Sequence, residues 1–416
     1  MNIQLLGNFL ARSAWWQGVA IRVPNRYLRP RPLRYPVASV HGIGGPWRFR
    51  GELLARTIRF VDSEPFLLII FIESPIQFIL SIYNCHMLFG CSPLNPRSGI
   101  LSCVVYVSGH RMEWTSYHRL EDIHGYLDYL AETFPDVCSV VSIGNSVEGR
   151  PLKVLRISNG KANAPALWID GGIHAREWIS PAAVTYIINH LVENSEDLEA
   201  DYYILPVVNP DGYEHTFTRD RLWRKNRQRS VGSLCTGVDL NRNFGYRWGG
   251  LGTSKDPCRE IYAGSGPFSE PETNAIRYFF EASAANFKVT HNYSNNTPII
   301  SSFASIDDLY DHGFYRITYW LKILRVLNLF EQSAAMKEAG GANSVYTVGN
   351  SATTLYAASG GSDDWAKAIL KMKYTYTIEL KDTGKYGFVL PARYIIPTAK
   401  EALAAVMVVT EACKSL

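Results

Sequence analysis

Helix-like and strand-like segments alternate along residues 117–413, and this alternation limits the folds open to the chain more than any other feature. Apolar residues recur every three or four positions over 117–134, which predicts an amphipathic helix. Further helices are predicted over 182–192, 273–284 and 399–413. Strands are predicted over 139–146, 152–158, 166–169, 202–208, 287–290 and 374–378. We therefore expect an α/β fold with a mixed, mostly parallel central β-sheet flanked by helices.

Short motifs are predicted to mark the boundaries of three elements. Ser180-Pro181 is predicted to supply the N-cap and the first proline of the helix over 182–192. The segment Asn209–Gly212 has the composition of a turn. Ser269-Glu-Pro-Glu272 has the form of a capping box before the helix over 273–284.

Residues 1–110 differ in composition from the rest of the chain. They hold eleven Arg, no Lys and four acidic residues, a formal charge of about +7, so the whole-chain charge of +4 leaves about −3 for residues 111–416. The longer part therefore gives no basic-patch signal for a nucleic-acid partner, and we expect none. We expect residues 1–111 to be an N-terminal extension, separate from one large domain over 112–416.

An apolar run from Phe66 to Tyr83 is close to the minimum length of a membrane span. Glu73 and Pro75 lie near its centre, where a charge is costly and a proline kinks the backbone, so we expect no membrane anchor. A membrane-anchored protein remains the alternative, which detergent-dependent extraction would reveal. The first residues lack a basic region and a long apolar stretch, and are therefore a poor signal peptide.

Three residues able to do chemistry follow predicted strands. We expect His174, His291 and Glu379 each to lie just past a strand end, and in open α/β sheets such ends converge on the ligand crevice. The spacing of His174 and Glu177 lets both reach one ion from a tight loop, and catalytic zinc takes three protein ligands with an open position. Taken alone, a histidine and an acid at this spacing are more typical of a solvated turn.

Eight ordered motifs between Met112 and Cys413 resemble the zinc metallocarboxypeptidases of the carboxypeptidase A/B family. They are Gly172-Ile-His-Ala-Arg-Glu-Trp178, Asn209-Pro-Asp-Gly-Tyr213, Leu222-Trp-Arg-Lys225, Asp239-Leu-Asn-Arg-Asn243, Ser265-Gly-Pro-Phe-Ser-Glu-Pro-Glu272, His291-Asn-Tyr293, Tyr356-Ala-Ala-Ser-Gly-Gly-Ser-Asp-Asp-Trp365 and Glu379-Leu-Lys-Asp-Thr-Gly384. Their order and rough spacing also agree with the family. The resemblance implies a zinc-dependent exopeptidase that hydrolyses the C-terminal peptide bond of peptides and proteins.

The resemblance also implies the catalytic residues. His174, Glu177 and His291 match the ligands of one zinc ion, and two imidazoles with one carboxylate suit that metal. Glu379 matches the general base, which takes a proton from water and delivers it to the leaving amine. Arg224 matches the guanidinium that stabilises the oxyanion.

The residues matched to substrate binding distinguish an exopeptidase from an endopeptidase. Arg242 with Asn241 matches the family's clamp for the terminal carboxylate, which a guanidinium can bind through two hydrogen bonds. Arg176 matches an arginine that holds the substrate further from its end, and Tyr356 a mobile tyrosine that closes over the bound end. Asp363 stands where members that cut after Lys or Arg carry an aspartate, so we expect a pocket of the B type.

Cys235 and Cys258 fall where the family has a disulfide, and that pairing implies maturation in an oxidising, secretory setting. We therefore expect a secreted, extracellular enzyme, and a monomer. Arg111 precedes the first matched helix, so a trypsin-like protease that cuts after it would release the catalytic unit.

Two regions depart from the family. Residues 1–110 do not resemble its pro-domain, and we interpret them as text outside the natural pro-segment. Residues 295–330 replace an expected strand and loop, and their abrupt edges favour a misread exon boundary. Smaller departures are Asn292 for Ser and Lys381 for Arg. The alternatives are the same enzyme class with a preference for aromatic or aliphatic ends, or a catalytically impaired peptide-binding member.

Overall fold

The computed structural model describes residues 110–414 with gaps at 284, 286, 295–298, 303–314, 342–343, 355 and 382–384, and before residue 110 it describes strand backbone only. Side chains are described from residue 110 onward, except those of residues 292–294, 299–302, 315–327 and 353–354. The chain divides into two compact units, Met1–His110 and Arg111–Leu416.

The first unit contains a five-stranded sheet in the order β1-β2-β5-β4-β3, in which every described strand pair is antiparallel. Its strands are β1 (Ile58–Val61), β2 (Leu67–Ile72), β3 (Ile79–Ile82), β4 (Cys85–Asn95) and β5 (Ile100–Gly109). Two of these strands, β2 and β3, lie within the apolar run from Phe66 to Tyr83. No helix in the described part of the chain has both the length and the apolar character needed to cross a membrane.

The second unit is built on an eight-stranded sheet in the order β12-β11-β13-β10-β8-β9-β7-β6. Its central strands β13, β10, β8 and β9 are parallel neighbours, whereas β6–β7, β7–β9 and β11–β13 are antiparallel pairs. The predicted mixed, mostly parallel sheet is therefore confirmed. The strands are β6 (Cys138–Asn145), β7 (Pro151–Ile157), β8 (Ala166–Gly171), β9 (Asp201–Leu205), β10 (Phe287–Ser294), β11 (Ile299–Ser302), β12 (Thr347–Asn350) and β13 (Tyr374–Glu379).

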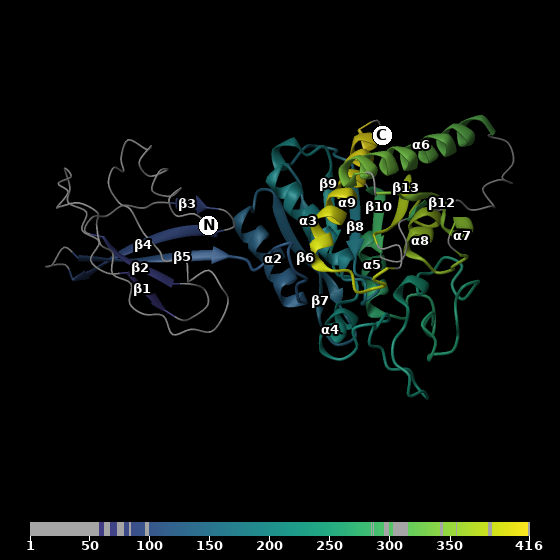
Figure 1. Ribbon diagram of the computed structural model, residues 1–416, viewed down its shortest axis with the longest axis horizontal. Helices are drawn as coiled ribbons and strands as arrows, with labels where there is room; N and C mark the ends of the chain where they lie inside the picture. Colours follow the sequence, from purple (N-terminus) through teal and green to yellow (C-terminus); the bar gives the residue numbers. More distant parts are fainter. Residues whose placement is uncertain are drawn as a thin grey trace. The chain divides into compact units, whose positions relative to one another are not determined.

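Helices flank this sheet, as Figure 1 shows. They are α2 (Leu120–Thr133), α3 (Ile179–Glu193), α4 (Pro210–Thr218), α5 (Pro271–Ala282), α6 (Tyr315–Gly340), α7 (Ser351–Thr354), α8 (Ser362–Ala368) and α9 (Ile395–Cys413). The amphipathic pattern of 117–134 is confirmed by α2, whose buried residues recur every three or four positions, and the terminal helix is confirmed by α9.

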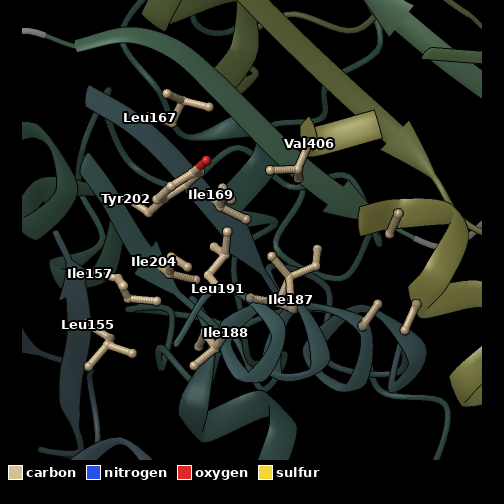
Figure 2. Packing of buried hydrophobic residues seen from close by; sticks show 14 of the residues in the cluster. Leu155, Ile157, Leu167, Ile169, Ile187, Ile188, Leu191, Tyr202, Ile204 and Val406 are labelled. Carbon is tan, nitrogen blue, oxygen red and sulfur yellow. The ribbon is translucent and has the colours of Figure 1, made fainter. Parts of the chain in front are cut away.

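The core lies on both faces of the sheet because the central strands bury both of their sides. In β8, Leu167 and Ile169 pack in one apolar cluster with α3 and α9, whereas Trp168 points into a second cluster with α5 and α8. Successive strand residues face opposite sides, so a strand apolar on both sides is held between two helical layers. Figure 2 shows the first cluster, in which Ile187 and Leu191 of α3 lie against the strand residues. This double packing fixes the strand ends from which the site loops depart.

The predictions for the element boundaries were wrong at three motifs. Ser180 lies inside α3 and its hydroxyl accepts a hydrogen bond from Gly172 N at 2.9 Å, so it anchors the preceding loop instead of capping the helix. The predicted turn at Asn209 is the start of α4, where the Asn209 side chain caps Gly212 N at 2.9 Å. Helix α5 begins at Pro271 without a side-chain cap, because the Ser269 hydroxyl donates to Glu270.

The atypical segment 295–330 contains a short strand and the start of a long helix. The strand β11 pairs antiparallel with β13 and parallel with β12, and α6 begins at Tyr315. At the described end of this segment, Asn328 and Leu329 are buried. The Asn328 side chain accepts a hydrogen bond from the Tyr376 hydroxyl at 2.8 Å, which joins α6 to β13.

Candidate active site

The loop that follows β8 brings His174 and Glu177 together. His174 Nδ1 lies 3.1 Å from Glu177 Oε1, and both side chains are buried. Gly172 begins this loop with φ of 65°, a conformation that glycine adopts at little cost. Its amide is held by Ser180, which fixes the turn from strand to loop. The tight loop predicted for this pair is therefore present.

Asp239 is a buried acceptor shared by three neighbours. Its Oδ1 lies 3.2 Å from His174 Nε2 and accepts from Asn241 N at 3.0 Å, while Oδ2 accepts from Arg224 Nε at 3.1 Å and Nη2 at 2.8 Å. Burial opposes the charge of Asp239, but Arg224, Arg242 and His174 outweigh it and hold its pKa well below the usual range. An ionised acceptor at Nε2 turns Nδ1 of His174 toward Glu177.

No role was predicted for Asp239 from the sequence, although it begins one of the matched motifs. An acidic residue in a short polar motif carries the same local signal whether it is solvated or buried. Only the fold, which brings His174 within hydrogen-bonding distance across 65 positions of sequence, identifies Asp239 as the residue that orients the imidazole.

The donor set fits zinc. Nδ1 of His174 and Oε1 of Glu177 lie together in a buried position, and Asp239 holds the other imidazole nitrogen of His174. Burial lowers the pKa of His174, as does Arg224, but the Glu177 and Asp239 carboxylates together raise it above its ordinary value. Among the described residues no group of three or more His, Cys, Asp or Glu side chains is arranged to hold a metal ion. His291, the predicted third ligand, lies on β10, the strand that pairs with β8.

His291 lies within β10 and not past its end, so the expectation for its position was wrong. The strand continues to Ser294 because β8 and β13 pair with it on both sides, with Ile169 and Tyr376 opposite His291. Its ring is fully buried, with the centroid 5.3 Å from that of Tyr376, and burial lowers its pKa to about 3. A neutral imidazole is the form that binds metal. Its role as a ligand stays a prediction.

Glu379 was expected just past a strand end, but β13 extends one residue further than predicted and Glu379 is its last residue, with a largely buried side chain. Two residues on, Lys381 pairs with the buried Glu401 of α9. Glu401 also accepts a hydrogen bond from the Tyr346 hydroxyl at 2.7 Å. The chain beyond Glu379 is therefore tied to the terminal helix by a charged network.

The matched carboxylate clamp lies on the short 3-10 helix Leu240–Arg242. Arg242 is buried, and its guanidinium donates from Nε to Gly252 O at 3.0 Å and from Nη1 to Asn241 O at 2.8 Å. The ring of the half-exposed Tyr356 lies with its centroid 5.9 Å from Arg242 Cζ. Tyr356 therefore lies beside the clamp residues Asn241 and Arg242, although it is more than 100 positions away in sequence.

Asp363 lies on α8, and α8 is attached to the clamp because Ser362 N donates to Asn241 Oδ1 at 3.0 Å. Asp363 is buried, and its pKa is raised by that burial. Burial and the neighbouring Asp363 charge raise the pKa of Asp364 to about 8, and burial raises that of Asp170 to about 7. Asp363 thus interacts with both Asp170 and Asp364 in a poorly solvated region, where each of the three carboxyl groups is harder to ionise than an ordinary aspartate.

Two further predicted features are the substrate-binding residue Arg176 and the disulfide between Cys235 and Cys258. Arg176 donates to Leu222 O and to Glu260, both at 3.3 Å, and its guanidinium lies 4.1 Å from the centroid of the Phe388 ring. Cys235 and Cys258 form a disulfide with a Cα–Cα distance of 5.1 Å, so the predicted pairing is confirmed.

Comparisons with known proteins identify the family of this chain. A family model described as zinc carboxypeptidase matches residues 123–405. Carboxypeptidase B of Astacus astacus is 44% identical over 312 residues, which cover 73% of this chain and 99% of that protein. Carboxypeptidase B2 of Bos taurus is 40% identical over 306 residues, 70% of this chain and 69% of that protein.

Among solved structures, bovine thrombin-activatable fibrinolysis inhibitor in complex with tick carboxypeptidase inhibitor matches 73% of this chain and 99% of its own, with 38% identity and a TM-score of 0.65. Carboxypeptidase A from Helicoverpa armigera matches 73% of this chain and 76% of its own, with 32% identity and a TM-score of 0.64. This chain belongs to the zinc carboxypeptidase family.

Proposed function

We propose that this zinc carboxypeptidase releases Lys or Arg from the C-termini of peptides and proteins. The observation that carries the proposal is Asp363, a buried carboxylate on the helix that is hydrogen-bonded to the clamp residue Asn241. A desolvated carboxylate disfavours an apolar side chain and favours a cation that pairs with it. The relatives named carboxypeptidase B support the same preference.

His174, Glu177 and His291 would hold the zinc ion, with Asp239 orienting His174. When bound, zinc supplies a Lewis acid that polarises the scissile carbonyl and makes water a stronger nucleophile. We propose that Glu379 accepts the proton of the attacking water and passes it to the leaving amine. Arg224, held on one edge by Asp239, would direct its other edge to the oxyanion.

We propose that Arg242 and Asn241 bind the terminal carboxylate, so that only the last peptide bond reaches the catalytic residues. Tyr356, which is half exposed, would close over the bound end, and Arg176 would contact the substrate further from its end. We also propose an extracellular, monomeric enzyme of residues 112–416, released by a trypsin-like cut after Arg111.

Arg242→Ala is expected to raise KM strongly for peptides with a free C-terminal acid. Hydrolysis of the same peptides as C-terminal amides, already slow, should change little because the amide offers no charge to the guanidinium. The comparison needs steady-state rates on both peptide forms for both enzymes. Equal losses on acid and amide would mean that Arg242 serves only the structure, through its bonds to Gly252 and Asn241.

The preference for Arg over Phe is expected to rise with pH. Burial raises the pKa of Asp363, and burial together with Asp363 raises that of Asp364 to about 8, so the pair loses its protons well above the ordinary aspartate range. The protonated acid cannot pair with a cation, whereas the ionised acid can, so the ratio of kcat/KM for Arg to that for Phe should fall as the pH drops from about 8 toward 5. A ratio constant over that range would contradict a pocket controlled by Asp363.

A further inference from the structure

Two loops lie beside Arg242, and their backbones are hydrogen-bonded to each other. One loop covers residues 249–252 and the other 356–361, the second of which begins with Tyr356. Ser359 N donates to Leu251 O at 2.9 Å, and Phe244 N donates to Gly360 O at 3.0 Å. The loop with Tyr356 is thus hydrogen-bonded both to the first loop and to the segment that follows the clamp.

Gly252 lies where the first loop contacts the second, at Ala357. Its carbonyl accepts the Arg242 Nε bond at 3.0 Å, while a Cβ added to it would lie 2.1 Å from Ala357 O. It has φ of 70°, so a side chain there would meet both a steric clash and an unfavourable backbone. The contact with Ala357 involves backbone atoms, which cannot rotate aside as a flexible side chain does.

A second close approach joins the same two parts. A Cβ added to Gly360, which has φ of 75°, would lie 2.4 Å from Arg242 O. The guanidinium and the carbonyl of Arg242 are therefore each in contact with one of the two loops. A shift of Arg242 toward a bound carboxylate can therefore reach the loop that begins with Tyr356 through the backbones of Gly252 and Gly360, in addition to the Tyr356 ring beside the guanidinium.

We infer that Gly252 is a positioning residue. It forms a joint between the carboxylate clamp and the loop over 356–361, which we call the tyrosine loop. Its carbonyl fixes the rotation of the Arg242 guanidinium, and its missing side chain lets Ala357 pack directly against it. Binding of a terminal carboxylate at Arg242 then restrains the tyrosine loop through this contact. The inference rests on the proposed role of Arg242, and it adds a residue that touches neither the substrate nor the metal.

Gly252→Ala tests the joint, with Gly250→Ala as the matched control in the same loop. A Cβ at Gly250 would lie 2.6 Å from Ser359 Oγ, a hydroxyl that can rotate away, and Gly250 has no positive φ. Dissociation constants of free arginine and of argininamide are measured by NMR titration of the zinc-loaded enzyme. We expect Gly252→Ala to raise the dissociation constant of free arginine at least about tenfold and that of argininamide less than about twofold. Gly250→Ala should leave both constants nearly unchanged.

The outcomes separate the joint from the proposed function. If wild-type enzyme binds arginine and argininamide equally, the clamp itself is refuted, and the joint with it. If the wild type prefers arginine but Gly252→Ala binds it as tightly as before, only the joint is refuted. The joint alone is also refuted if Gly252→Ala weakens the binding of both ligands equally, because a general loss of structure would have that effect.

Hydrogen exchange in the wild type tests the joint without any substitution, should Gly252→Ala fail to fold. The amide of Ser359 donates to Leu251 O across the two loops, so its exchange reports their separation. Free arginine is expected to slow that exchange several-fold, whereas argininamide should not. Equal exchange rates with and without arginine would overturn the inference.

Discussion

Glu379→Gln is expected to lower kcat by roughly 10³-fold or more, because an amide cannot take the proton of the attacking water. The substitution keeps the size of the side chain, which is largely buried at the end of β13. Zinc content and the binding of free arginine should be unchanged, since Glu379 is proposed neither as a metal ligand nor as part of the clamp. The measurement is kcat on a peptide ending in Arg, with bound zinc determined on the same sample.

A matched control is Glu401→Gln, which removes a buried carboxylate of the same kind from α9. Glu401 pairs with Lys381 and Tyr346, so its loss should lower the unfolding temperature more than it lowers kcat. A Glu379→Gln enzyme with a near-native rate would show that another group is the base.

Asp363→Ile is expected to reverse the order of preference between basic and apolar ends. The wild type should favour Arg over Phe by at least about tenfold in kcat/KM, which corresponds to about 1.4 kcal/mol of transition-state binding. Isoleucine removes the charge that a cation pairs with and leaves an apolar pocket base, so Phe should become the better substrate. Both specificity constants are measured on peptides that differ only in the last residue.

Asp363→Asn is the matched control for shape. It keeps the volume of the side chain and one acceptor oxygen but removes its charge, so it should lose the preference for Arg without gaining one for Phe. A wild type that prefers Phe, or an Asp363→Ile enzyme with an unchanged ratio, would contradict the proposed preference and leave the family assignment standing.

Six of the eight strands of the second unit, together with α2, α3, α5 and α9, were predicted because their own residues carry a local pattern. Leu167 and Ile169 face one helical layer and Trp168 the other, and this two-sided burial makes β8 a continuous apolar run in sequence. The helix α2 shows its buried stripe in the same direct way. Such patterns depend on residues close together in the chain.

The errors came from features decided by distant partners. Ser180 has the residue type of a helix cap, but its hydroxyl accepts a hydrogen bond from the Gly172 amide of the preceding loop. The four-residue strand β11 is held by β12 and β13, both of which begin more than 40 residues further along the chain. His291 extends β10 because strands on both sides pair with it.

The site was predictable in its motifs but not in its connections. The pair His174 and Glu177 is a local pattern, and the structure places the two 3.1 Å apart. Asp239, which orients His174, and Gly252, which accepts from Arg242, contact their partners only through the fold. Their roles depend on distance and backbone approach, which residue type alone does not encode.

Zinc-dependent removal of a single C-terminal residue is tested by mass spectrometry of the products from zinc-free and zinc-loaded enzyme. The substrates are one peptide ending in Arg and its C-terminal amide. We expect zinc-loaded enzyme to remove one Arg from the free acid and to leave the amide nearly intact, whereas zinc-free enzyme should release no Arg from either peptide until zinc is restored. Internal cleavage of the peptide, or full release of Arg by enzyme shown to be free of metal, would contradict this expectation.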